Sequence, residues 1–143
     1  MRSLGLDVGD KRTGVAISDP QGILATPLTV LASEDEDALL KEIIKLVEQY
    51  EIERIVVGLP YSLSGDLGQQ AEKAIAFSEK LSHHGLNIQL WDERLSTKGA
   101  ERLMIEAGTK RNKRNQYRDA MAAALILQGF LDSLTACSDP DHT

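Results

Sequence analysis

Three acidic residues that lie far apart in the sequence, Asp7, Glu93 and Asp119, are the side chains best suited to catalysis. Asp7 lies in the apolar segment SLGLDV, where a charge without a partner is costly to bury. Each acid also has an ordinary structural interpretation. These are, respectively, a turn-capping aspartate, a glutamate in a surface ion pair, and an aspartate that favours the dipole at the start of a helix.

The three acids are expected at one edge of the fold, since two lie near strand ends and Asp119 shares a helix face with apolar residues. Carboxylates brought together repel one another unless they are protonated or bridged by cations. Oxygen ligands without Cys or His favour Mg²⁺ or Mn²⁺. Two such ions, roughly 3.5–4 Å apart, could activate a water and stabilise the leaving oxygen in phosphodiester hydrolysis. The acids therefore predict a two-metal-ion nuclease.

Basic residues are concentrated in one part of an acidic chain. Residues 94–118 contain eight Lys and Arg against two Glu, a local formal charge of +6, so the remainder carries −12 to give the total of −6. Clustered basic side chains neutralise backbone phosphates and release counterions, which indicates a nucleic-acid partner. A solvated surface loop is the alternative for such a charge run. The predicted substrate-binding residues are Lys11, Arg12, Arg94, Lys110, Arg111, Lys113, Arg114 and Arg118.

The elements that would position these residues begin with three antiparallel strands. Residues 3–8 and 13–19 are short, apolar and joined by the polar turn GDKR, which predicts a β-hairpin. Residues 23–31 form a third strand, and Pro27 inside it predicts an edge position because proline cannot donate to a sheet ladder.

The rest of the chain alternates helices with strands. Amphipathic periodicity predicts helices, and short apolar runs ended by Gly, Pro or charge predict buried parallel strands. The basic segment TKRNKRN, residues 109–115, has no periodicity and predicts a mobile loop. The expected elements are helix 34–47, strand 54–59, helix 71–81, strand 87–91, helix 96–108 and helix 116–134.

This order, βββαβαβαα, predicts an α/β fold with a mixed five-stranded sheet and helices on both faces. A length of 143 residues suits one domain, expected over residues 1–134, with a disordered tail at 135–143. No apolar run is long enough to span a bilayer, and the start of the chain does not resemble a signal peptide. The lone Cys137, expected in the polar tail, leaves no disulfide framework, so a reducing cytoplasm is expected.

The chain resembles the YqgF/RuvX proteins, a branch of the ribonuclease H-like superfamily related to the Holliday junction resolvases, over nearly its whole length. The resemblance implies that Asp7, Glu93 and Asp119 take the positions of the catalytic metal-binding acids, with Arg12 and Arg94 at basic positions beside them. It also implies a nuclease that matures the 5′ end of the 16S rRNA precursor, or a resolvase of branched DNA. Ser96 departs from the threonine expected there. The segments that carry the resemblance are LGLDVGDKRTGVAISD, VVGLP, WDERLST and RDAMAAALILQGFLD.

Two other functional possibilities and the oligomeric state stay open at this point. The segment DVGDKRTGVAISD also resembles the first phosphate-binding hairpin of sugar kinases and heat-shock ATPases, although no second glycine-rich hairpin is visible. A catalytically silent RNA-binding assembly factor would keep the fold and the basic segment. Within the nuclease interpretation, a resolvase is expected to dimerise, whereas trimming one RNA strand needs only one active site, so a monomer or a weak homodimer is compatible.

Overall fold

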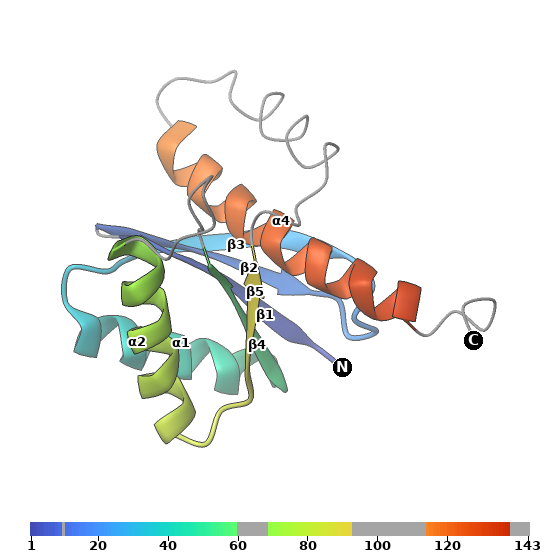
Figure 1. Ribbon diagram of the computed structural model, residues 1–143, viewed down its shortest axis with the longest axis horizontal. Helices are drawn as coiled ribbons and strands as arrows, with labels where there is room; N and C mark the ends of the chain where they lie inside the picture. Colours follow the sequence, from blue (N-terminus) through green and yellow to red (C-terminus); the bar gives the residue numbers. More distant parts are fainter. Residues whose placement is uncertain (10, 60–68, 93–113, 138–143) are drawn as a thin grey trace.

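The structure is a computed structural model that describes residues 1–9, 11–59, 69–92 and 114–137 (Figure 1). Strands and helices alternate as the sequence predicts, with three strands before the first helix. The described elements are β1 (Ser3–Val8), β2 (Arg12–Ser18), β3 (Ala25–Ala32), α1 (Glu36–Tyr50), β4 (Arg54–Leu59), α2 (Gln69–His83), β5 (Ile88–Asp92) and α4 (Arg114–Cys137).

The five strands form one mixed sheet in the order β3-β2-β1-β4-β5. β1, β2 and β3 pair antiparallel, while β4 and β5 are parallel to β1 and reach the sheet through crossover helices. The carboxyl ends of β1, β4 and β5 therefore lie at the same edge of the sheet. β2 begins at that edge, because it runs antiparallel to β1.

β3 is an edge strand, which confirms the prediction made from Pro27. Pro27 is paired with Ala16, and the register between β2 and β3 shifts between Val15 and Ala16, next to that pair. A ladder irregularity at an edge tolerates the missing N–H of proline.

Helices cover both faces of the sheet, as predicted. Figure 1 shows α1 and α2 together on one side and α4 on the other. The side chains of Leu4, Leu6 and Val8 belong to the core under α1 and α2, whereas Ala16 and Val56 belong to the core under α4. Successive side chains of a strand point to opposite faces, so the odd-numbered residues of β1 lie on the α4 face.

The N-terminus of α1 is set by its cap. The side chain of Asp35 accepts hydrogen bonds from the backbone N–H groups of Asp37 and Ala38, at 3.1 and 3.3 Å. An N-cap of this type supplies partners to amides that have none within the helix.

The last helix is longer than predicted at both ends. α4 begins at Arg114 rather than at residue 116, so Arg114 and Asn115, expected in a loop, are helical. It ends at Cys137, which was expected in a polar tail. Arg and Ala are good helix formers, and packing against the sheet extends a helix beyond its periodic apolar part. The expected helix 96–108 and the loop residues 109–113 lie outside the described residues, as do residues 138–143.

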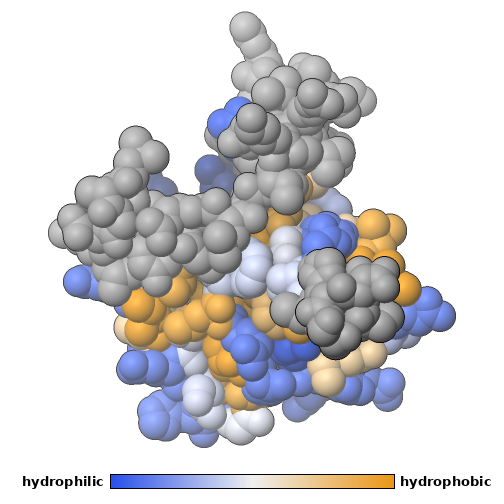
Figure 2. Space-filling view, turned by 45° about the vertical axis from the view of Figure 1, so that its right-hand side comes forward, coloured by the Kyte–Doolittle hydropathy of each residue, from blue (hydrophilic) through white to orange (hydrophobic). Residues whose placement is uncertain are grey.

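The distribution of hydrophobic and hydrophilic residues on the surface does not by itself indicate a binding site. Figure 2 shows hydrophobic and hydrophilic residues intermingled on one face of the protein. No helix among the described ranges is long and apolar enough to cross a membrane. Scattered exposed apolar side chains are ordinary on protein surfaces and do not mark a binding site. Among the described residues, the large exposed ones are Met1, Ile23, Leu24, Leu90 and Leu134.

Candidate active site

Asp7 lies near the carboxyl end of β1, on the face of the sheet that α4 covers. Its neighbours Leu6 and Val8 are buried on the opposite face, and Asp7 itself is half-buried. Its partner across the antiparallel ladder is Gly14 of β2. The apolar sequence around Asp7 thus forms the strand, and strand alternation turns the one acidic side chain away from the core under α1 and α2.

α4 touches the sheet directly at Gly14. A Cβ atom placed on Gly14 would lie 1.8 Å from the carbonyl oxygen of Asp119 and 2.3 Å from its carbonyl carbon. Only glycine permits so close an approach of two backbones. Because Gly14 is the ladder partner of Asp7, this contact brings Asp7 and Asp119 to the same place on the α4 face.

A second close contact fixes the direction of α4 across the sheet. A Cβ atom on Gly5 would lie 2.8 Å from Cβ of Leu127 and 2.9 Å from the carbonyl oxygen of Ala123. Gly5 lies two residues before Asp7 on the same face of β1. α4 therefore crosses the hairpin with its amino-terminal part over the edge where β1 ends.

Asp119 forms an ion pair with Arg12, the first residue of β2. Nε of Arg12 lies 3.0 Å from Oδ2 of Asp119, with the two side chains 43% and 28% exposed. Oδ2 is shielded from solvent and accepts no hydrogen bond. Its contact with Nε of Arg12 is close enough for an ion pair but does not have the geometry of a hydrogen bond. A carboxylate oxygen is the kind of donor that a hard cation binds, and a cation at Oδ2 would compete with Arg12 for it.

The position of Asp119 excludes its simplest structural interpretation. It is the sixth residue of α4, in the second turn, and the first turn contains no acidic residue. The expectation that Asp119 opens the helix is wrong, because α4 begins earlier than predicted. A helix-dipole role falls off beyond the first turn and does not account for this acid.

The third predicted acid, Glu93, lies outside the described residues. β5 ends at Asp92, which pairs with Leu59 of β4, and Glu93 is the next residue in the sequence. Within the described ranges no three His, Cys, Asp or Glu residues gather into a metal-binding group. Asp7 and Asp119 are thus the two members of the predicted trio that the structure places.

Some of the predicted substrate-binding residues lie within the described ranges and some lie outside them. Lys11 and Arg12 are exposed at the β1–β2 turn, and Arg118 is exposed on α4 next to Asp119. Arg114 lies in the first turn of α4. The remaining residues of the set lie outside the described ranges: Arg94, Lys110, Arg111 and Lys113.

Two residues that help to build the site were missed by sequence reasoning. Gly14 could have been found, because a glycine inside a strand marks a close backbone approach. Ser33 could not, because a single serine after a strand carries no distinctive pattern. It is buried, its hydroxyl donates to the carbonyl of Gly9 at 2.7 Å, and its N–H donates to the carbonyl of Lys11 at 3.0 Å.

Comparison with solved structures defines the class of fold. Thermus thermophilus RuvC, solved in complex with a Holliday junction substrate, superposes with a TM-score of 0.65 at 14% identity and covers 94% of this chain and 97% of its own. Fowlpox virus resolvase superposes with a TM-score of 0.59 at 12% identity, and the match covers 94% of this chain and 99% of the resolvase. The yeast mitochondrial resolvase Ydc2 superposes with a TM-score of 0.55 at 12% identity, and the match covers 90% of this chain and 77% of Ydc2. The chain has the ribonuclease H-like fold of the resolvases, as the sequence resemblance implied.

The family follows from sequence comparison. The model of the RuvX family, described as Holliday junction resolvase, matches residues 1–133. A relative from Clostridium botulinum strain Hall is 46% identical over 136 residues, which cover 94% of this chain and 99% of the relative. A relative from Desulforamulus reducens is 47% identical over 134 residues, which cover 93% of this chain and 98% of the relative. Both carry the name "Putative pre-16S rRNA nuclease". The chain belongs to the RuvX family.

Proposed function

We propose that this protein is a metal-dependent nuclease that hydrolyses phosphodiester bonds, with Asp7, Glu93 and Asp119 as its catalytic metal-binding acids. The single observation that carries this proposal is the backbone contact of Asp119 with Gly14, the ladder partner of Asp7. It brings two acids that are 112 residues apart (119 minus 7) to one end of the parallel strands. Glu93 follows directly after β5, whose carboxyl end lies at the same edge.

The donor atoms suit magnesium or manganese. The proposed ligands are all carboxylate oxygens, and Oδ2 of Asp119 is shielded from solvent without a hydrogen bond. Hard dications prefer such oxygens, and a pair of them supplies an activated water and charge stabilisation at the leaving oxygen. Asp7 and Asp119 would orient the ions, and Arg12 beside them would attract a backbone phosphate to the same place.

The substrate we propose is the 5′ region of the precursor of 16S rRNA. The support comes from curated relatives that are 46% and 47% identical over nearly the whole chain and are named for this precursor. A single strand to be trimmed needs one active site and a basic surface along its backbone. The residues proposed to contact it are Lys11, Arg12, Arg94, Lys110, Arg111, Lys113, Arg114 and Arg118.

Cleavage of branched DNA is the second candidate. The description of the family model and the resolvase folds of the structural neighbours favour it. A resolvase must cut two strands symmetrically, which requires two copies of the active site. Dimerisation on a four-way junction, measured by analytical ultracentrifugation, would therefore favour this substrate over precursor rRNA. ATP binding is not proposed, because the family model and the curated relatives describe nucleases over almost the entire chain.

The proposal is tested by cleavage assays on single-stranded RNA, precursor rRNA and four-way DNA junctions, each with Mg²⁺, with Mn²⁺ and with EDTA. Wild type should cleave only with metal, and Asp7→Asn and Asp119→Asn should each abolish cleavage. Asp132→Asn is the matched control, since it makes the same change on α4, thirteen residues or about 20 Å along the helix from Asp119. Cleavage that survives both EDTA and the substitutions at Asp7 and Asp119 would refute the mechanism, and binding without cleavage would indicate a silent RNA-binding module.

A further inference from the structure

We propose that Ser33 is a positioning residue of the active site, which fixes the β1–β2 turn and thereby the place where Lys11 and Arg12 receive a substrate phosphate. This inference rests on the proposed nuclease function. Ser33 itself would not touch the substrate, because it is only 1% exposed.

Ser33 is bonded to both sides of the turn. Its hydroxyl donates to the carbonyl of Gly9, which follows β1, at 2.7 Å. Its backbone N–H donates to the carbonyl of Lys11, which precedes β2, at 3.0 Å. One buried residue thus bridges the end of β1 and the start of β2 from outside the hairpin. The backbone bond continues the β2–β3 ladder, in which Arg12 pairs with Ala32, while the hydroxyl bond depends on this side chain alone.

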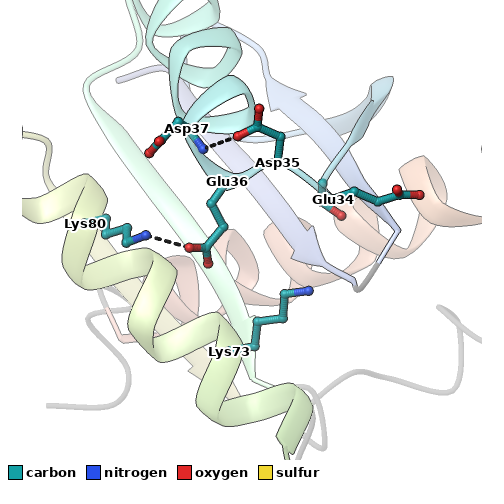
Figure 3. A pocket seen from close by; sticks show the side chains of 7 residues that line it. Glu34, Asp35, Glu36, Asp37, Lys73 and Lys80 are labelled. Atoms are coloured by element: carbon teal, nitrogen blue, oxygen red, sulfur yellow. Dashed lines mark hydrogen bonds and ion pairs between the residues drawn. The ribbon is translucent and has the colours of Figure 1, made fainter.

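The segment that contains Ser33 is itself fixed to the rest of the fold. Two residues later, Asp35 caps α1. Glu36 in the first turn of α1 forms an ion pair with Lys80 of α2 (Figure 3). Figure 3 also shows the pocket beside this segment, which is lined by the acidic residues 34–37 and by Lys73 and Lys80 of α2. The helix cap and the ion pair hold this segment in place, so Ser33 is attached to a fixed support.

The turn matters because of what it positions. Arg12 begins β2 and lies 3.0 Å from Asp119, and Lys11 is exposed beside it. Loss of the Ser33 hydroxyl would leave the carbonyl of Gly9 without this donor and free the turn to move. A basic side chain on a mobile turn binds a phosphate less well, because binding must then order the turn.

The test measures binding of a fluorescein-labelled single-stranded RNA, with the precursor sequence, to the full chain in EDTA. Ser33→Ala should weaken binding by about fivefold, the factor expected for one net hydrogen bond. Ser78→Ala is the matched control: Ser78 is 4% exposed and its hydroxyl donates to the carbonyl of Ile75 within α2. It should bind RNA as wild type does.

A mutant cycle separates positioning from general destabilisation. If Ser33 acts through the turn, Ser33→Ala should have little further effect on binding in a background that lacks both basic side chains, Lys11→Ala with Arg12→Ala. Full additivity of Ser33→Ala with that background, unchanged binding by Ser33→Ala, or an equal loss in Ser78→Ala would each overturn the proposal, as would the absence of RNA binding by wild type. If Ser33→Ala does not fold, Ser33→Cys keeps the size of the side chain with a weaker donor and should show an intermediate loss.

The readout also separates this inference from the proposed function. Binding in EDTA needs no metal and no turnover. If wild type binds RNA but never cleaves it, the nuclease assignment is refuted, and the binding assay still tests the role of Ser33. Conversely, metal-dependent cleavage with unchanged binding by Ser33→Ala would refute only the role of Ser33.

Discussion

Replacing Gly14 by alanine should slow the enzyme strongly, although the substitution changes none of the proposed metal ligands. The added Cβ would lie 1.8 Å from the carbonyl oxygen of Asp119, whereas real Cβ contacts essentially never fall below 3.0 Å. The backbone of α4 at Asp119 must therefore retreat by at least the difference of 1.2 Å. The neighbouring atoms are backbone atoms, so no side-chain rotation can relieve the contact.

The size of the effect follows from this displacement. A misplacement near 1 Å in an active site can cost about 100-fold in rate, so kcat of Gly14→Ala should fall by about that factor. Overpacking costs about 1–3 kcal/mol, and the reduced entropy of the unfolded chain offsets about 0.4–1 kcal/mol of it. A net destabilisation of about 1–2 kcal/mol is expected by urea unfolding.

Gly5→Ala is the graded control for this prediction. Its Cβ would lie 2.8 Å from Cβ of Leu127, so a shift of 0.2 Å brings the contact to 3.0 Å. It alters the same helix–sheet interface farther from the acids, and kcat should stay within a few-fold of wild type. Wild-type kcat and stability in Gly14→Ala, or an equal loss of kcat in Gly5→Ala, would refute the reasoning.

Two further predictions concern charged residues. Arg12→Ala should cost less than about 1 kcal/mol of stability, because its ion pair with Asp119 is partly exposed. It should also reduce the slope of log affinity for single-stranded RNA against log salt by about 0.7, and an unchanged slope would contradict a phosphate contact. Asp19 accepts from the N–H groups of Ile23 and Leu24, which lowers the pKa of its carboxyl below its usual 3.8. Because the folded-state pKa is the lower one, its stabilisation is complete above the unfolded pKa and is lost as pH falls through the folded value. Asp19→Ala should therefore be less stable than wild type at pH 6, and urea midpoints that differ equally at pH 6 and pH 3 would count against this.

The sheet could be predicted because its strands carry local signals. The apolar strands, the turns between them and Pro27 determine where β1, β2 and β3 begin and which of them is the edge. Asp7 could be singled out for the same reason, since one acid in an apolar strand violates the pattern around it.

Other parts of the site depend on tertiary contacts. The start of α4 at Arg114 has no periodic apolar signal, and so the sequence placed it two residues too late. The contact of Gly14 with Asp119 arises only when α4 packs on the hairpin. The hydroxyl bond of Ser33 spans 24 residues and follows from the positions of β3 and the turn. A glycine inside a strand signals a close approach without saying which residue approaches, and Ser33 has no local signature at all.

The central claim is that Asp7, Glu93 and Asp119 bind divalent ions together, and calorimetric titration with Mn²⁺ tests it most directly. Wild type and Asp132→Asn should bind the ion equally, while Asp7→Asn, Glu93→Gln and Asp119→Asn should each weaken binding by at least about tenfold. Undiminished Mn²⁺ binding in all three variants, or no binding by wild type, would contradict the account.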